Sequence, residues 1–327
     1  MATFPVISSI LSPRHIASHV VAYYNLESAS ARLLRAGVNH TYLIETGEER
    51  YVYRVYTRNW RSKEEIEAEI QLLAALKEQG IKVSYALPDK EGGWMQEIEA
   101  AEGMRYGLLF SYCGGKLIRE HTGASARKLG ETMAHMHQVM QNRTLPRKTY
   151  DATSLLTWAA AQLAAHFHPE QEEVQYVQRA AKKLAEVMAE APASQLRTGL
   201  VHLDMGYGNI KEQEDGSIAV YDFDNLGNGW LFLDIAYSVM IMFRHQPHRE
   251  KYEVLLAAFL AGYETVLPVS ETEKSLIPWG GMAIWLHYAG VHAYRFDDFT
   301  SVFFDEAFLK FWVTFIHGWL EYHGIEI

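Results

Sequence analysis

The chain has 327 residues, which is enough for about two domains, each able to bury its own core. Apolar residues make up 49% of it and charged residues 21%, a globular composition that excludes a largely disordered chain. The 40 acidic and 30 basic side chains give a net charge of −10, which excludes a general electrostatic interaction with nucleic acid or with an anionic membrane surface.

We expect the first 113 residues to form a small antiparallel β-sheet that carries one helix. The predicted elements are a leading helix over 12–24, a hairpin of strands over 42–46 and 51–56, a helix over 62–79, and strands over 94–100 and 104–111. In the second hairpin strand, Arg54 shares a face with Val52 and Tyr56, because side chains alternate along a strand. Ser62 and Glu65 predict a capping box at the start of the helix.

After Gly114 and Gly115 the pattern becomes mostly helical. Helices are predicted over 123–142, 151–167, 170–190, 230–246, 248–266, 272–293 and 300–323. An island at 198–225 interrupts them, with strand-like runs at 199–203 and 218–223. The sequence therefore predicts an α+β protein of two domains, 1–113 and 114–327.

The island contains the residues with the clearest chemistry. His202, Asp204 and Asn209 form the pattern H-x-D-x-x-x-x-N, and Asp222 follows a predicted hairpin. Phosphoryl transfer needs a carboxylate near the attacking hydroxyl and oxygen ligands that hold magnesium against the phosphates. Asp204 is thus predicted as the base, with Asn209 and Asp222 as metal ligands, in a loop typical of kinases. Asp224 is either a further metal-site acid or, as we favour, a cap of the following loop.

These motifs resemble the aminoglycoside phosphotransferase/choline kinase family, a branch of the protein-kinase-like fold. The resemblance covers most of the chain and runs through residues 37–42, 51–55, 69–73, 129–137, 202–209 and 222–236. It implies a two-lobed fold, with a nucleotide-binding N-terminal lobe and a helical C-terminal lobe, and a kinase that uses ATP and Mg²⁺. It also implies that Asp204 is the catalytic aspartate, that Asn209 and Asp222 bind magnesium, and that His202 and Asp234 have structural roles.

In the N-terminal lobe, the resemblance places the residue that grips the nucleotide phosphates at Arg54 and its helix partner at Glu69. This position is more often lysine among kinases, although arginine is also a cation with donors that match phosphate. The segment from Gly37 to Asn39 has one glycine where protein kinases have three. The resemblance implies that Asn39 covers the nucleotide, while a simple turn residue remains an alternative.

Residues 110–113 lie where the resemblance places the hinge between the lobes, so Phe110, Tyr112 and Cys113 are expected to bind adenine through their backbone. Cys113 is the single cysteine, which excludes an intrachain disulfide and a cysteine-based zinc site. The histidine pairs 135/137 and 166/168 point apart on helices and are expected to be ordinary residues. Without a signal peptide or a membrane span, the sequence predicts a cytoplasmic protein.

The C-terminal helices are where the resemblance places the acceptor pocket. Tyr294, Arg295, Asp297 and Asp298 form a polar cluster before the last helix. The two acids beside an aromatic ring could receive an amine, whereas Arg295 could hold a carboxylate, and the sequence leaves both readings open. Residues 201–327 hold 18 acidic and 7 basic side chains, which favours a cationic acceptor modestly.

We therefore expect a kinase that phosphorylates a hydroxyl of a small molecule, such as an aminoglycoside-like antibiotic, an amino alcohol such as choline, or a homoserine-like amino acid. A bacterial Ser/Thr protein kinase of the same fold is an alternative. Asp234 follows Asp222 by only twelve positions, which leaves no room for a long activation segment and favours small molecules. A catalytically silent nucleotide-binding module is the third hypothesis, and the complete set of Asp204, Asn209 and Asp222 argues against it.

Overall fold

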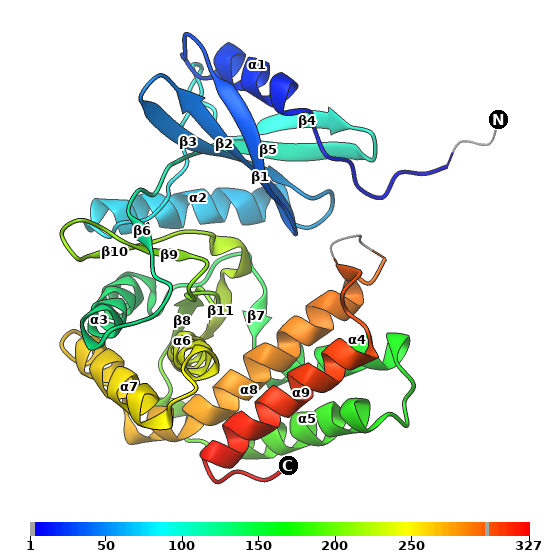
Figure 1. Cartoon of the computed structure of the whole chain (residues 1–327), viewed down its shortest axis with the longest axis vertical. Coiled ribbons are helices and arrows are strands. Elements are labelled where there is room, and N and C mark those ends of the chain that lie inside the picture. Colours follow the sequence, from blue (N-terminus) through cyan, green and yellow to red (C-terminus); the bar gives the residue numbers. More distant parts are fainter. Residues whose placement is uncertain (1–3, 298–300) are drawn as a thin grey trace. The chain divides into compact units, whose positions relative to one another are not determined.

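A computed structural model of the chain describes residues 4–297 and 301–327 (Figure 1). Its contacts divide the chain into two compact units, Met1–Gly114 and Gly115–Ile327, called here the N-terminal and C-terminal units. The division lies one residue after the predicted boundary. The N-terminal unit is built mainly on a β-sheet and the C-terminal unit mainly on helices, so the predicted α+β class is confirmed.

The N-terminal unit contains an antiparallel five-stranded sheet with the order β1-β2-β3-β5-β4. Its strands are β1 (Ser30–Ala36), β2 (Asn39–Thr46), β3 (Glu49–Tyr56), β4 (Gln96–Ala100) and β5 (Gly103–Ser111). Helices α1 (Pro13–Tyr23) and α2 (Lys63–Glu78) lie on opposite sides of this sheet (Figure 1). Both arms of the predicted hairpin are present as β2 and β3, and the predicted capping box of Ser62 and Glu65 starts α2.

The alternation of side chains along β3 assigns its two faces to the two helices. Tyr53 and Val55 are fully buried in the apolar core that also contains Ile16 and Val20 of α1. Arg54 points to the other side, where it contacts α2. The face of β3 that holds Arg54 therefore meets α2, the helix predicted over 62–79.

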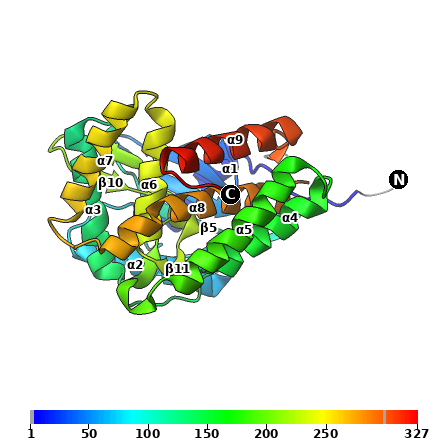
Figure 2. The same ribbon diagram turned by 90° about the horizontal axis from the view of Figure 1, so that it is seen from below.

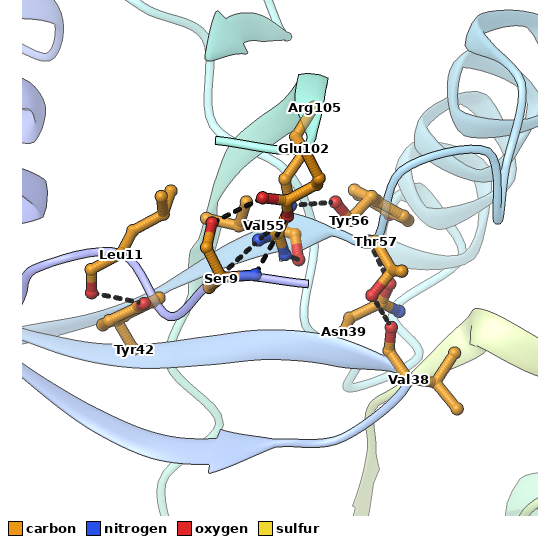
Figure 3. Close-up of polar contacts among 10 residues, drawn as sticks. All are labelled: Ser9, Leu11, Val38, Asn39, Tyr42, Val55, Tyr56, Thr57, Glu102 and Arg105. Atoms are coloured by element: carbon orange, nitrogen blue, oxygen red, sulfur yellow. Dashed lines mark hydrogen bonds and ion pairs between the residues drawn. The ribbon is translucent and has the colours of Figure 1, made fainter. Parts of the chain in front are cut away.

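A buried ion pair fastens the segment before α1 to this sheet. Arg105 Nη1 lies 3.3 Å from Glu102 Oε1, and Ser9 Oγ donates to Glu102 Oε2 at 2.5 Å. Arg105 Nε also donates to the main-chain oxygen of Tyr56 at 2.8 Å (Figure 3). Because every charged atom of this cluster has a partner, the cost of burying it is offset by hydrogen bonds.

The C-terminal unit is mainly helical. Its helices are α3 (Gly123–Met140), α4 (Trp158–His166), α5 (Glu172–Glu190), α6 (Phe232–His245), α7 (Arg249–Tyr263), α8 (Glu271–Tyr294) and α9 (Glu306–Tyr322). Its strands are β6 (Lys116–Leu117), β7 (Thr149–Tyr150), β8 (Thr198–Val201), β9 (Ile210–Glu212), β10 (Ile218–Val220) and β11 (Gly227–Trp230). They form two three-stranded sheets with the orders β10-β9-β6 and β7-β11-β8. No helix within the described residues is both long and apolar enough to cross a membrane.

Helices α3 and α7 lie side by side, as Figures 1 and 2 both show. Two glycines permit this close approach. A Cβ atom on Gly130 would lie 2.0 Å from the main-chain oxygen of Phe259, and one on Gly262 would lie 2.0 Å from that of Arg127. Both distances are far below van der Waals contact, so any larger side chain at either position must push the helices apart.

The structure differs from the sequence prediction at several element ends. The last helix begins at Glu306 rather than at residue 300, because Asp305 caps it and its carboxylate accepts the amide of Phe308 at 2.8 Å. A short π-helical turn, Thr153–Thr157, precedes α4 inside the predicted helix 151–167. Strands β1, β6, β7, β9 and β11 were not predicted individually, and β11 overlaps the predicted helix 230–246 at Trp230 only.

Candidate active site

The segment 202–209 follows β8 and is held by a buried carboxylate of α6. Asp234 Oδ2 accepts the backbone N–H of His202 at 2.8 Å, and Oδ1 accepts that of Leu203 at 2.5 Å. Leu203 has a φ of 60°, in the left-handed region that residues with a Cβ seldom adopt. The two hydrogen bonds to a charged group supply the stabilisation that this strained turn requires.

Asp234 is also joined to the helices α3 and α7. His137 Nε2 lies 3.0 Å from Asp234 Oδ2, and His137 Nδ1 lies 2.7 Å from the hydroxyl of Tyr263. All three side chains are buried. The sequence predicted an ordinary histidine at 137 and a structural role for Asp234, and the structure shows that the two residues share one buried network under the loop.

Asp204 lies at the start of the loop, and its side chain is bound by α6. The Tyr237 hydroxyl donates to Asp204 Oδ1 at 2.6 Å. Asp204 itself is partly buried, whereas Tyr237 is only 7% exposed. Burial raises the pKa of Tyr237 well above its ordinary value, so this hydroxyl keeps its proton and remains a donor.

His202 is fully buried and supports the loop from inside. Its Nδ1 accepts the backbone N–H of Asp204 at 3.1 Å, and its ring packs against that of Phe223 with centroids 4.4 Å apart. Burial lowers the pKa of His202, which keeps the ring neutral, with its proton on Nε2. This arrangement agrees with the supporting role that the resemblance implies.

The hairpin of β9 and β10 joins the backbone at Asn209 to the backbone beside Asp222. The backbone N–H of Tyr221, the neighbour of Asp222, donates to the main-chain oxygen of Asn209 at 3.0 Å. Asn209 is buried, and its side-chain N–H₂ donates to the main-chain oxygen of Asp204 at 3.0 Å, so its carboxamide oxygen points away from that carbonyl. Asp222 has a φ of 66°, a second left-handed residue in this short region.

This pair of side chains offers a carboxamide oxygen and a carboxylate, which are the hard donors that Mg²⁺ prefers. The chemistry of these two donors therefore suits a magnesium ion. Among the described residues, no cluster of three or more His, Cys, Asp or Glu side chains forms a metal centre of its own. Asp224 lies in the 3₁₀ turn Phe223–Asn225, where it is buried, and its main-chain oxygen accepts from Arg147 Nη1 at 3.2 Å.

In the N-terminal unit, the ion pair predicted between Arg54 and Glu69 is present. Arg54 Nη1 lies 3.0 Å from Glu69 Oε1, and the Tyr56 hydroxyl donates to Glu69 Oε2 at 3.2 Å. Both charged residues are buried. The Arg54 guanidinium also lies 4.9 Å from the centre of the Phe110 ring, so its orientation is fixed from two sides.

Asn39 is buried at the start of β2. Its side-chain oxygen accepts the backbone N–H of Thr57 at 3.3 Å, and the Thr57 hydroxyl donates to the main-chain oxygen of Val38 (Figure 3). Asn39 therefore connects the glycine segment before β2 to the end of β3.

The predicted hinge residues lie at and after the end of β5. Phe110 is buried within this strand and pairs with Val52 of β3. Tyr112 follows the strand, and the Arg50 guanidinium lies 4.4 Å from the centre of its ring. Cys113 is half-buried and forms no disulfide.

The predicted acceptor residues lie at the C-terminal end of α8. Tyr294 is 61% exposed, and its ring centre lies 6.0 Å from that of Trp158. Arg295 is half-buried and ends the helix, with its N–H donating to the main-chain oxygen of Val291 at 3.1 Å. Asp297 is exposed, and Asp298 lies outside the described residues.

Two aromatic groups of the C-terminal unit already hold a cation of the chain itself. The Arg244 guanidinium lies 4.9 Å from the centre of the Trp285 ring, and the Lys148 ammonium lies 4.2 Å from that of Trp158. An aromatic cage binds a ligand cation through the same ring faces. These two tryptophans therefore do not present an open cage for a quaternary ammonium group.

Tyr237 is the main residue of this region that the sequence did not single out. A signal was present, since residues three apart on a helix share a face and Tyr237 is three positions after Asp234. A polar side chain there faces the same loop that Asp234 binds. Tyr288 of α8 also binds this loop, since its hydroxyl donates to the main-chain oxygen of Leu203 at 2.7 Å.

Comparison with known proteins gives consistent results. Residues 30–269 match the model of the phosphotransferase enzyme family. An uncharacterized protein of Deinococcus radiodurans is 29% identical over 324 residues, which cover 98% of this chain and 94% of the relative. The solved structure of a microcompartment-associated aminopropanol kinase has a TM-score of 0.74 at 24% identity, covering 94% of this chain and 95% of that one. An amicoumacin kinase in complex with AMP-PNP, Ca²⁺ and Ami has a TM-score of 0.77 at 18% identity, covering 94% of each chain.

Proposed function

The chain belongs to the phosphotransferase enzyme family and is a kinase with a hydroxyl acceptor, and from this premise we propose that it transfers the γ-phosphate of ATP to a small molecule through Asp204. The observation that carries the proposal is the geometry of the loop 202–209. Asp204 has one carboxylate oxygen fixed by Tyr237, and its backbone neighbours are held by Asp234. A carboxylate fixed in this way is preorganised to receive a proton.

In the proposed step, the oxygen of the acceptor hydroxyl attacks the γ-phosphorus of ATP. The bond from that phosphorus to the oxygen bridging it to the β-phosphate breaks, which releases ADP. The proton of the hydroxyl passes to the carboxylate of Asp204, and the product is a phosphate monoester. Asp204 contributes by orienting the hydroxyl and by accepting its proton as the new bond forms.

We propose that Asn209 and Asp222 hold magnesium, because they provide two hard oxygen donors on backbone segments that the hairpin joins. When bound, the metal neutralises charge on the phosphate oxygens. The left-handed backbone of Asp222 sets the direction of its carboxylate, and the bond from Asn209 to the Asp204 carbonyl orients the carboxamide. The base and the metal ligands are therefore parts of one hydrogen-bonded segment.

We also propose that Arg54 binds the nucleotide phosphates, with Glu69 as the residue that orients it. A guanidinium has several donors in one plane, so it can bind the carboxylate of Glu69 and still offer N–H groups to a phosphate. Asn39 and the backbone of residues 110–113 are proposed to contact the rest of the nucleotide. Because ATP is made and used inside the cell, we propose that the protein acts in the cytoplasm.

For the acceptor, we propose recognition by the polar residues at the end of α8 rather than by an aromatic cage. The rings of Trp158 and Trp285 are occupied by Lys148 and Arg244, which disfavours a choline-like cation at those faces. Tyr294 and Asp297 are exposed beside Arg295, so the end of α8 offers one charge of each sign. A small acceptor with both an amine and a hydroxyl fits this surface, and a carboxylate on the same molecule could reach Arg295.

The test is turnover of ATP over a panel of amino alcohols, homoserine-like amino acids and aminoglycosides, with mass detection of the phosphorylated product. We expect one of these classes to give a phosphate monoester and one equivalent of ADP. Asp204→Asn should bind ATP as the wild type does and lose turnover by at least about a hundredfold, since it removes the base. Unchanged turnover in that variant, or phosphorylation of a protein substrate alone, would contradict the proposal.

A further inference from the structure

We propose that Tyr237 is a positioning residue for the catalytic base, and that it acts by fixing the carboxylate of Asp204 in one orientation. The inference rests on the proposed role of Asp204. It starts from a single contact, in which the Tyr237 hydroxyl donates to Asp204 Oδ1 at 2.6 Å. This is the short distance expected when a hydroxyl donates to a charged oxygen.

The contact restricts the carboxylate because Tyr237 cannot move easily. Tyr237 lies in the middle of α6 and is 7% exposed, and its ring packs edge-on against that of Tyr288, with centroids 6.0 Å apart. Rotation of the Asp204 carboxylate about its Cβ–Cγ bond would break a partly buried hydrogen bond to a charged group, and losing such a bond costs more than losing one between neutral groups. The orientation of the base is therefore set by a helix and not by the loop alone.

Tyr288 is itself fixed by the loop and by a second polar residue. Its hydroxyl donates to the main-chain oxygen of Leu203 and accepts from Asn225 Nδ2 at 3.2 Å. Leu203 is the residue immediately before Asp204. Two tyrosines from different helices, α6 and α8, thus hold the side chain of Asp204 and the backbone beside it.

Two residues of α6 bind different parts of the loop around the base. Asp234 holds the loop backbone through His202 and Leu203, and Tyr237, one turn later on the same helix, holds the side chain that reacts. Because the reacting hydroxyl and the carboxylate must meet within hydrogen-bond distance, a carboxylate with free rotation would spend part of its time turned away. Loss of the Tyr237 hydroxyl should accordingly slow the chemical step and leave nucleotide binding as it is.

The test compares Tyr237→Phe with Tyr252→Phe. Tyr252 is a fully buried tyrosine of α7 whose hydroxyl has no hydrogen-bond partner among the described residues, so its replacement removes the same atom away from the loop. For each variant we would measure the single-turnover rate of phosphate transfer with enzyme in excess, the KM for ATP and for the acceptor, and Tm. Single-turnover kinetics separate the chemical step from product release.

We expect Tyr237→Phe to lower the single-turnover rate and kcat by about ten- to a hundredfold, with both KM values within about twofold of the wild type. Tyr252→Phe should keep the wild-type rate within about twofold. The proposal is overturned if Tyr237→Phe turns over like the wild type. It is equally overturned if the loss of rate is accompanied by weaker ATP binding or a much lower Tm, because the residue would then be structural.

Failure of this inference can be distinguished from failure of the proposed function. If the wild type phosphorylates no acceptor, or if Asp204→Asn keeps full activity, the role of Asp204 is wrong and Tyr237 has no base to position. If the wild type is active and Asp204→Asn is inactive while Tyr237→Phe is unaffected, only the role of Tyr237 is wrong.

Discussion

The carboxylate of Asp234 binds the backbone of Leu203 in a left-handed conformation: Oδ1 accepts the Leu203 N–H at 2.5 Å, and φ of Leu203 is 60°. The strained residue directly precedes Asp204. The position of the proposed base thus depends on a carboxylate thirty residues further along the chain.

Asp234→Asn tests this dependence. The amide group offers one oxygen where the carboxylate offers two, so one loop N–H must face an NH₂ group. We expect turnover to fall by about tenfold or more, and the free energy of unfolding to fall by about 2–4 kcal/mol. Asp305→Asn is the matched control, because asparagine caps a helix as well as aspartate does. Equal stability and turnover of the two variants would refute the assigned role of Asp234.

Arg54→Gln should both destabilise the N-terminal unit and weaken ATP binding. Glu69 is 1% exposed, so loss of its cationic partner leaves a buried carboxylate to which the Tyr56 hydroxyl donates. Breaking a buried ion pair from one side costs about 3–5 kcal/mol. Arg32→Gln, on an exposed position of β1, is the control.

A double-mutant cycle with Glu69→Gln separates the two effects of Arg54. If the pair is coupled, the double variant should lose less free energy of unfolding than the sum of the losses of the two single variants. The KM for ATP should stay high in the double variant, because the phosphate-binding cation is still missing. Recovery of ATP binding in the double variant would show that Arg54 serves only the fold.

Gly130→Ala should lower stability although alanine is the better helix former. The added Cβ would lie 2.0 Å from the main-chain oxygen of Phe259, which forces α3 away from α7. We expect a loss of about 1–3 kcal/mol in the free energy of unfolding. Gly318→Ala in α9 is the opposite case, because a Cβ there meets no atom within 4 Å. The free energy of unfolding of this variant should rise by up to about 1 kcal/mol. Urea unfolding of both variants would show whether the signs differ.

Stability should decrease as the pH falls below neutrality, partly through His287. Burial lowers the pKa of His287 to about 3, whereas the unfolded chain has a histidine pKa of about 6.5. Between these values the unfolded state binds a proton that the folded state does not, so this contribution is complete above pH 6.5 and is lost as the pH falls towards 3. It amounts to about 1.4 kcal/mol for each pH unit in that window.

His287→Gln should therefore flatten the pH dependence of the free energy of unfolding between pH 6.5 and 4.5. His15→Gln, at an exposed position of α1, is the control. The comparison concerns the slopes, so an overall loss of stability in His287→Gln does not affect it. Equal slopes for the wild type and both variants would contradict the prediction.

The two charges at the end of α8 should separate the two classes of acceptor. Asp297→Asn should raise the KM for an amine-bearing acceptor by about two- to fivefold, the size expected of an exposed charge. Arg295→Gln should raise the KM for a carboxylate-bearing acceptor by a similar factor. Neither should change kcat, since the contact is the same in the ground state and the transition state. If neither variant changes any KM, the acceptor is recognised elsewhere.

Much of the fold could be predicted because the signals were local. The helix over 62–79 has its stripe and its capping box within one segment, and the structure places α2 at Lys63–Glu78. The edge strand β1 has no such signal, because its residues are mostly half-buried or exposed and it is ordered by pairing with β2. The short strands of the C-terminal unit depend in the same way on partners that are distant in sequence.

The same distinction applies to the candidate site. The loop from His202 to Asn209 was predicted because its residue types and spacing lie within eight positions. The contacts that orient it come from Tyr237 and Tyr288, which belong to different helices and lie 33 and 85 positions away from their partners. A helical pattern can place these residues on a face, but it does not show what that face will meet.

Helix α8 is attached to the region around the catalytic loop at two places. Glu273 in its first turn forms a bidentate pair with Arg197, with both N–O distances at 2.9 Å, and Tyr288 near its other end holds Leu203. The turn beyond Tyr288, residues 291–297, lies outside both attachments. If this segment recognises the acceptor as proposed, sequence changes in it would alter the accepted molecule while the proposed base keeps its place, so the end of α8 is a practical target for directed libraries.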